Sequence, residues 1–196
     1  MPKFVLSKSK LLSQYAQVEK LADEISYSSK TNQLVTPILE KETNCMFSVH
    51  MPNELKHVQD KTRVWYLTQA WTKEHLNDLI TQGVNSFVID NEADLKILTS
   101  YLLEHDVKIN LLLRMRLREM SIRTERYFVF GIPVEKSNEL LMQILNDPKL
   151  KDKINQSGFH IHRKTQNMSE WRLKEELEDM IFPETLKKIS IVNIGG

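Results

Sequence analysis

Short runs rich in β-branched and aromatic residues alternate along this chain with longer stretches whose apolar residues recur at helical spacing. Parallel strands produce such an alternation, because a parallel neighbour is reached only through a long crossover that is usually a helix. The sequence therefore predicts an α/β fold. We expect strands at residues 24–28, 45–49, 64–67, 86–89, 108–113, 158–162 and 189–194. We expect helices at residues 7–21, 73–81, 93–105, 133–145 and 171–181.

Several expected strands are continuous apolar runs, such as Ile-Asn-Leu-Leu-Leu at residues 109–113. Strands of this kind are buried on both faces, as in barrels and doubly wound sheets, and periodicity does not separate these two architectures. Ser7 is a candidate N-cap for the first helix, and Pro133 a candidate first helical residue. With 196 residues and no low-complexity linker, we expect a single domain over 1–196.

The charge balance argues against a polyanionic partner. Lys and Arg number 27 and Asp and Glu 26, so neither nucleic acid nor an anionic membrane surface is expected. The single cysteine, Cys45, excludes an internal disulfide framework. No window approaches the run of about 18 apolar residues that a membrane span needs. We expect a cytoplasmic protein that binds a small molecule.

The motif Tyr27-Ser28-Ser29-Lys30-Thr31-Asn32 lies at the C-terminal end of the first expected strand. A lysine in such a loop is usually solvated, but small neighbours here leave room for a ring. The hexamer resembles Tyr-Ala-Val-Lys-Ala-Asn of the ornithine/diaminopimelate/arginine decarboxylase family (group IV, fold-type III). The resemblance implies that Lys30 forms a Schiff base with pyridoxal 5'-phosphate (PLP). Independently of the resemblance, Asn32 is a candidate N-cap for the next helix.

Later segments resemble the same family in order. Residues 47–55 resemble Phe-Asp-Val-Ala-Ser-x-x-Glu-Leu, with Ser48 in place of the aspartate and Glu54 at the acidic position. Residues 158–166 resemble Gly-Leu-His-Phe-His-x-Gly-Ser-Gln, and 192–196 resemble the start of Leu-Asp-Ile-Gly-Gly-Gly. Weaker matches are residues 66–72, 83–90, 112–114 and 130–133; Val129 stands where the family has a lysine.

The resemblance implies an alanine-racemase-like (β/α)8 TIM barrel followed by a C-terminal β-domain. Because the chain ends inside the glycine triplet, we expect it to be truncated after the seventh strand and to lack the β-domain. Barrel active sites lie at the C-terminal ends of the strands, so Lys30, Arg114, His162 and Gly195 should meet there. In the family a second subunit completes each active site, so a homodimer is expected of the full-length form.

The resemblance also assigns roles around the cofactor. His162 would stack on the PLP ring, Thr165 would lie near the phosphate, and Gly195 and Gly196 would let the backbone approach the phosphate. Arg114 would lie near the cofactor; the alternative is that it belongs to a solvated basic stretch. His160 and His162 have the spacing of a metal pair, but matching Cys or carboxylate ligands are absent, and no metal is expected.

The leading functional prediction is PLP-dependent decarboxylation of a basic or diamino amino acid of the ornithine, lysine, arginine or diaminopimelate type. Lys30 and His162 would be its catalytic residues. Two alternatives stay open. One is a non-catalytic PLP-binding barrel protein. The other is an inactive remnant of a decarboxylase, which the replacements at Ser48 and Val129 would suit.

Overall fold

The computed structural model describes residues 4–116, 130–162 and 173–195. The chain forms two compact units, which we describe separately. The first comprises Met1–Leu67 and Leu79–Asn85, and the second comprises Thr68–Asp78 and Ser86–Gly196. Thr165 and Gly196, two of the predicted site residues, lie outside the described residues, as does Val129.

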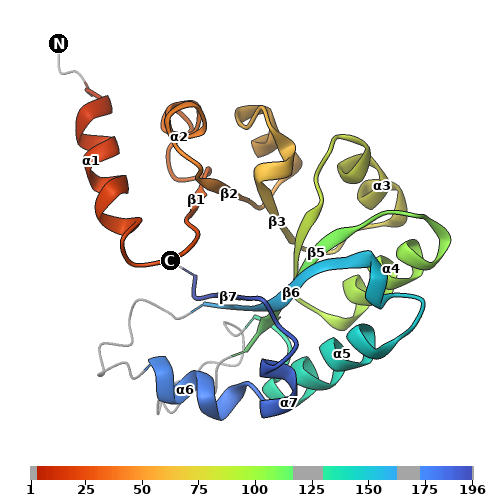
Figure 1. Ribbon diagram of the computed structural model, residues 1–196. Coiled ribbons are helices and arrows are strands. Elements are labelled where there is room, and N and C mark those ends of the chain that lie inside the picture. The colour runs from red at the N-terminus through yellow and green to blue at the C-terminus, as the bar shows by residue number, and fades with distance from the viewer. Residues whose placement is uncertain (1–3, 117–129, 163–172, 196) are drawn as a thin grey trace. The chain divides into compact units, whose positions relative to one another are not determined.

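The strands follow one another in the order of the sequence (Figure 1). The first unit holds β1 (Ser26–Ser28), β2 (Met46–Val49) and most of β3 (Val64–Thr68). The second holds β4 (Ser86–Ile89), β5 (Ile109–Met115), β6 (Ile154–Ile161) and β7 (Ile191–Asn193). Within each unit every neighbouring pair is parallel, which confirms the predicted parallel α/β architecture.

Helices connect these strands. They are α1 (Lys8–Val18), α2 (Thr36–Glu42), α3 (Lys73–Thr81), α4 (Glu92–Glu104), α5 (Val134–Asn146), α6 (Leu173–Met180) and α7 (Pro183–Leu186). Short 3-10 helices are η1 (Pro52–His57), η2 (Lys61–Arg63) and η3 (Lys151–Lys153). Within the described ranges, no helix has the length and apolar content needed to cross a membrane.

The caps of two helices were predicted from sequence, with different outcomes. The Ser7 hydroxyl accepts a hydrogen bond from the Lys10 backbone N–H, so Ser7 is the N-cap of α1, as expected. Pro133 is not the first residue of α5: its ψ of 149° is extended, so it is the N-cap and the helix begins at Val134. Pro133 also lacks a polar side chain, and no side-chain hydrogen bond caps this helix.

The strand register of the second unit arranges one face of its sheet in rows. Ser86 is paired with Asn110, and Asn110 with Gln156; the Asn110 amide also donates to the Ser86 hydroxyl at 2.8 Å. The next row is apolar, and the last, near the C-terminal ends, is polar. These rows are Val88–Leu112–Gly158–Ile191 and Arg114–His160–Asn193. Polar rows therefore lie at both ends of this face. The row that contains an arginine and a histidine lies at the C-terminal ends of the strands, where barrel sites form.

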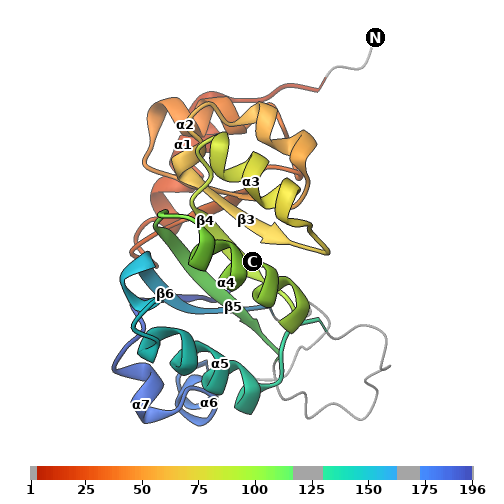
Figure 2. The same cartoon turned by 90° about the vertical axis from the view of Figure 1, so that its right-hand side faces the viewer.

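The alternate residues of the same strands are apolar and buried. They include Phe87, Ile89, Leu111, Leu113 and Phe159, each with 0% of its surface exposed. Figure 2 shows α4 and α5 lying along one side of β4, β5 and β6. Their buried leucines and isoleucine complete this core. Burial on both faces explains the continuous apolar run that the sequence shows in β5.

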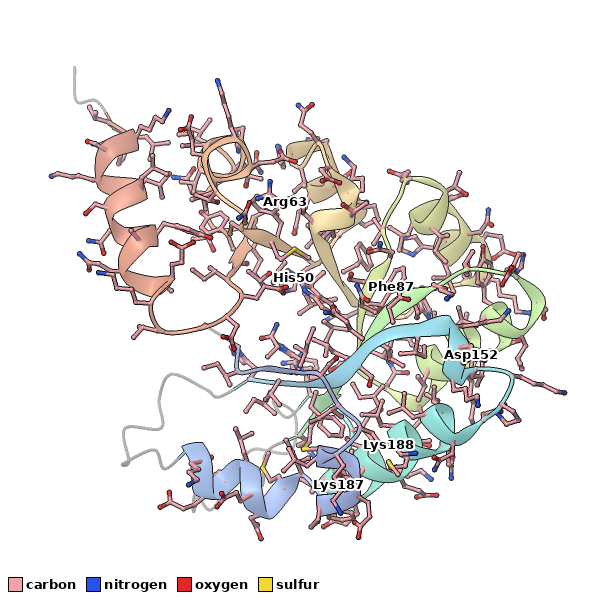
Figure 3. The ribbon with its side chains drawn as sticks, in the orientation of Figure 1. His50, Arg63, Phe87, Asp152, Lys187 and Lys188 are labelled. Carbon is pink, nitrogen blue, oxygen red and sulfur yellow. The ribbon has the colours of Figure 1, made fainter. Side chains whose placement is uncertain are left out.

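Arg63, the last residue of η2, links several backbone segments of the first unit through its guanidinium. Its guanidinium donates to the carbonyl oxygens of Glu40 (2.7 Å), Thr43 (2.9 Å) and Cys45 (2.9 Å from Nε), and lies 5.3 Å from the centre of the Phe47 ring. These carbonyls belong to the end of α2 and the segment that enters β2, beside which Figure 3 labels Arg63. One cation thus satisfies acceptors that a helix C-terminus leaves open.

Candidate functional site

Lys30 lies in a turn immediately after β1, and its side chain is exposed. The turn is closed by a hydrogen bond from the Thr31 N–H to the Ser28 carbonyl at 3.1 Å. The Tyr27 hydroxyl donates to the Asn32 carbonyl at 3.3 Å and so ties the far side of the turn to the strand. Lys30 is therefore presented by a constrained backbone at the C-terminal end of its strand.

Asn32 does not cap the next helix, contrary to the prediction. Its side-chain oxygen accepts from the Leu34 N–H at 3.1 Å, which forms a local turn before α2 begins. The residue at the N-cap of α2 is Val35, whose apolar side chain cannot accept a capping hydrogen bond. Asn32 thus stabilises the loop that carries Lys30 rather than the helix itself.

Serine hydroxyls occupy the face of β1 and β2 that leads to this turn. Ser28 pairs with Ser48 in the strand register, and the Ser29 N–H donates to the Ser48 carbonyl at 3.3 Å. The Ser48 hydroxyl lies 2.8 Å from the Ser26 hydroxyl. The position where the family resemblance has an aspartate is therefore neutral here and is already hydrogen-bonded to a second serine.

His50 and Glu54 follow β2 at the same end of the sheet. The Glu54 carboxylate accepts from the His50 backbone N–H at 2.9 Å, and its Oε2 lies 3.9 Å from Nδ1 of the imidazole. Burial, followed by the negative charge of Glu54, raises the pKa of Tyr66 to about 12. The sequence pointed to Glu54 but gave His50 no role, because the resembling family has alanine at that place.

Arg114 lies near the end of β5 in the second unit. Its Nη1 is 3.4 Å from Oδ1 of Asp90, and its guanidinium lies 5.2 Å from the centre of the Phe130 ring. Only 16% of the Arg114 side chain and 15% of the Asp90 side chain are exposed. Burial raises the pKa of Asp90, while the positive charge of Arg114 opposes the shift. This geometry is not that of an arginine within a solvated basic stretch.

His160 and His162 have different environments despite their two-residue spacing. His160 is 6% exposed within β6, whereas His162 follows the strand and is exposed. Among the described residues, no group of three or more His, Cys, Asp or Glu side chains is placed to hold a metal ion. His162 is thus the histidine that projects beyond the end of the sheet.

Gly195 packs directly against the end of β6. Its φ is +70°, and a Cβ at this position would lie 2.7 Å from the Ile161 carbonyl oxygen and 3.2 Å from Nδ1 of His162. Only glycine tolerates both the backbone conformation and this close approach. The Gly195 N–H donates to the Asn193 side chain at 2.9 Å, so this donor is already used within the turn.

The second unit therefore brings three of the predicted site residues to one end of its sheet. Arg114, His162 and Gly195 lie at or just beyond the C-terminal ends of β5, β6 and β7, which are parallel neighbours. Lys30 lies beyond the C-terminal end of β1 in the first unit. Each residue lies at or just beyond the strand end that supplies active-site groups in barrel enzymes.

Comparisons with known proteins identify the fold. No protein-family model matches the chain, and no curated protein matches its sequence. Solved structures do match. The lysine/ornithine decarboxylase from Vibrio vulnificus, solved with cadaverine, is 17% identical with a TM-score of 0.59, over 81% of this chain and 41% of that one. The diaminopimelate decarboxylase from M. jannaschii is 19% identical with a TM-score of 0.61, over 80% and 41%.

A third structure, of a protein called SrLDC in complex with PLP and cadaverine, is 17% identical with a TM-score of 0.61, over 86% of this chain and 47% of that one. The chain thus spans about two fifths of the length of the first two decarboxylases. At such identities the likeness concerns the fold. The seven parallel strands and their helices have the fold of part of the barrel found in PLP-dependent decarboxylases.

Proposed function

We propose that this chain holds PLP through a covalent link to Lys30, as the barrel portion of an amino-acid decarboxylase. The observation that carries the proposal is the constrained turn after β1, which presents an exposed lysine at the catalytic end of its strand. Support comes from the shared fold with lysine/ornithine and diaminopimelate decarboxylases, and from SrLDC, which was solved with PLP.

The described residues are chemically compatible with this cofactor. An exposed primary amine is available at Lys30, and exposed His162 offers a flat ring beside a turn that admits only glycine. The buried Ser29 hydroxyl and the Ser28 Oγ have no hydrogen-bond partner among the described residues, which leaves polar groups beside Lys30. PLP, when bound, supplies an electron sink for the carbanion that decarboxylation leaves behind.

The other roles at the cofactor would belong to residues of this chain. Lys30 would provide the amine that holds the aldehyde. On the family resemblance alone, His162 would pack on the ring. The Gly195 turn allows the backbone to approach the phosphate; it does so by its shape, because its own N–H donates to Asn193. Arg114 forms an ion pair with Asp90, and on the family resemblance it would contribute positive charge near the cofactor. We assign Thr165 and Gly196 to the phosphate as well, on the family resemblance alone.

The substrate class in this proposal is a basic or diamino amino acid. It rests on the names of the matching structures, which are lysine/ornithine and diaminopimelate decarboxylases. Because the chain spans about two fifths of those proteins, we assign the complete reaction to a longer, homodimeric form rather than to these 196 residues. PLP attachment is the part that this chain itself should perform.

A second candidate is a PLP-binding barrel without decarboxylase activity. Ser48 favours it, because a neutral hydroxyl paired with Ser26 occupies the place of an acidic residue on the face leading to Lys30. The two candidates share PLP binding and differ in turnover. Release of carbon dioxide from ornithine, lysine, arginine or diaminopimelate by PLP-loaded protein would support the decarboxylase, and PLP binding without turnover would support the second candidate.

The first test is direct. The purified chain mixed with PLP should develop the visible absorbance of a covalent lysine adduct, and borohydride reduction with peptide mapping should place the pyridoxyl label on Lys30. Lys30→Ala should abolish both signals while the protein stays folded, because an exposed lysine in a turn contributes little to the core. Lys41→Ala and Lys56→Ala, which remove exposed lysines of α2 and η1, should keep both signals. A label on another lysine would contradict the assignment.

A further inference from the structure

Two side chains from different segments of the second unit contact the guanidinium of Arg114. The carboxylate of Asp90, which follows β4, lies 3.4 Å from Nη1 of Arg114. The guanidinium carbon lies 5.2 Å from the centre of the Phe130 ring. Only 16% of the Arg114 side chain is exposed. A long side chain that is largely buried against a carboxylate and a ring keeps few of its rotamers, so the direction of its guanidinium is defined.

The backbone around Gly131 explains why a ring lies against Arg114. The Ile132 N–H donates to the Arg114 carbonyl at 2.8 Å, and the Arg116 N–H donates to the Ile132 carbonyl at 2.8 Å, so this segment pairs with the end of β5. Gly131 has a φ of +101°, and a Cβ there would lie 2.8 Å from the Arg114 carbonyl oxygen. Only glycine permits this approach. Phe130 is 54% exposed, so burial in the core does not account for its position.

The ion pair with Asp90 leaves donors of Arg114 for a ligand. A guanidinium carries five N–H donors in one plane, which suits two oxygens of a single oxyanion. The contact with Asp90 involves Nη1 at 3.4 Å, and within the described ranges Oδ1 of Asp90 has no hydrogen-bond partner. Asp90 thus holds Arg114 by charge without using its whole set of donors. Arg114 lies opposite His160 in the strand register, near the C-terminal end of the sheet.

We infer that Asp90 and Phe130 are positioning residues that direct the Arg114 guanidinium toward an oxyanion of the proposed cofactor. This inference rests on the proposed function. PLP carries two groups of this kind, its phosphate and the oxygen on its ring, and both suit a guanidinium. Asp90 pairs with Nη1, and Phe130 packs on the guanidinium. Neither residue contacts the cofactor in this role, because each acts through Arg114.

The first measurement concerns Arg114 itself and needs no cofactor. Phenylglyoxal modifies arginines, and fragmentation of the labelled peptides gives the extent at Arg114 relative to Arg116, an exposed arginine on the same segment. Asp90→Asn and Phe130→Ala should each raise this ratio about threefold, because each frees the guanidinium from one contact. Phe130→Tyr retains an aromatic ring and should therefore retain the ratio.

Two exposed residues of the second unit provide matched controls. Asp152→Asn and Phe182→Ala should leave the labelling ratio unchanged, because neither side chain contacts Arg114. An unchanged ratio in both Asp90→Asn and Phe130→Ala would overturn the inference.

The second measurement asks whether the direction of Arg114 matters for PLP. Titration of the visible absorbance gives the affinity, which Arg114→Gln, Asp90→Asn and Phe130→Ala should each weaken about three- to tenfold. In protein that already carries Arg114→Gln, Asp90→Asn should cause no further loss, because a positioning residue acts only through its arginine. A full additional loss in the double variant would overturn the positioning role, since Asp90 would then act on the fold or on PLP directly.

Pyridoxal, which lacks the phosphate, identifies the oxyanion. If Arg114 binds the phosphate, the three variants should weaken the binding of PLP alone. If it binds the oxygen on the ring, they should weaken the binding of pyridoxal to the same degree. Either result supports the inference, whereas equal PLP affinity in the variants and the unsubstituted protein would overturn it.

The same proteins distinguish failure of this inference from failure of the proposed function. PLP attachment at Lys30 with unchanged affinity in the Arg114, Asp90 and Phe130 variants would reject the inference and keep the cofactor assignment. Raised Arg114 labelling in Asp90→Asn and Phe130→Ala, without PLP attachment to the unsubstituted protein, would reject the cofactor assignment and keep Asp90 and Phe130 as residues that position Arg114.

Discussion

At the scale of single residues, two positions are held by contacts that few other side chains could make. Gly158 in β6 lies against Ile191 of β7 so closely that a Cβ would sit 1.7 Å from the Ile191 carbonyl oxygen. Arg63 satisfies three backbone carbonyls from one guanidinium. The first is a constraint on volume and the second on hydrogen-bonding geometry, so each predicts a different sensitivity to substitution.

Gly158→Ala should destabilise the protein by about 3 kcal/mol or more, because a methyl group overlaps backbone that belongs to a paired strand and cannot rotate away. Chemical denaturation would measure the loss in the free energy of unfolding. Gly83→Ala provides a comparison: a Cβ there would meet only the Lys61 Cβ at 3.5 Å, although its φ of +98° still strains the backbone. A smaller loss at Gly158 than at Gly83 would contradict this reasoning.

Arg63→Lys should cost about 2 kcal/mol, even though the positive charge is retained. A lysine ammonium cannot reach Glu40, Thr43 and Cys45 carbonyls together, and buried acceptors left without donors are costly. The measurement is again denaturant unfolding. Arg116→Lys, at an exposed arginine after β5, is the matched control and should change stability little.

At the scale of elements, the loop from β3 to α3 is fixed to the start of α4 by one buried carboxylate. Asp94 is 3% exposed and accepts from the backbone N–H groups of Ala70 (3.0 Å) and Trp71 (3.3 Å) and from the Asn91 amide (2.7 Å). Asn91 in turn is the N-cap of α4 and accepts from the Asp94 N–H. Two elements thus share a single network.

Asp94→Ala should therefore destabilise by about 2 to 3 kcal/mol and loosen the loop, since it leaves buried donors without a partner. Ala70 has a φ of 51° in this loop, a conformation that costs a residue with a Cβ more than glycine. Hydrogen exchange should show faster exchange at Ala70 and Trp71 in Asp94→Ala. Protection equal to that of the unsubstituted protein would show that the carboxylate does not hold the loop.

At the scale of the whole molecule, two buried acids of the first unit set an alkaline limit on stability. Burial raises the pKa of Cys45 to about 11 and that of Tyr66 to about 12. Both groups have higher pKa values folded than their ordinary values of 9.0 and 10.0. The unfolded chain therefore releases these protons first, and stability should be intact below about pH 9 and fall until about pH 12.

Each of these shifts corresponds to about 2 to 3 kcal/mol once complete. Denaturant unfolding at several pH values would measure the slope. Cys45→Ala should reduce the loss of unfolding free energy that begins at about pH 9. Tyr66→Phe should reduce the loss that begins at about pH 10. A decline of the same steepness in the double variant would mean that other groups cause the alkaline loss.

We predict that the chain itself associates. Large apolar side chains are exposed near the N-terminus: Phe4, Val5 and Leu21 have 110%, 85% and 83% exposure, and Leu34 has 69%. Exposed apolar groups of this kind favour association. Sedimentation velocity should show species larger than the 23.0 kDa chain as the concentration rises. A stable monomer throughout would contradict the expected oligomer.

Local sequence patterns determined much of this fold. The bounds predicted for 73–81 and 86–89 are those observed for α3 and β4, and Ser7 caps α1 as expected. Helical periodicity, strand propensity and capping are encoded in adjacent residues, so a single sequence reveals them. The position of Lys30 after β1 follows from the same patterns. The short helices α2 and α7 carry too few turns to show a period. A helix after Asn32 was expected without bounds, and α7 was not predicted.

Tertiary structure alone decided how distant residues meet. The row Arg114–His160–Asn193, the contact of Gly158 with Ile191, the pairing of Asp90 with Arg114 and the place of His50 beside Glu54 depend on strand register and on the paths of loops. Register is set by packing across whole strands, whose partners lie far apart in the chain. The sequence therefore identified single residues that could carry chemistry, whereas folding determined which residues contact them.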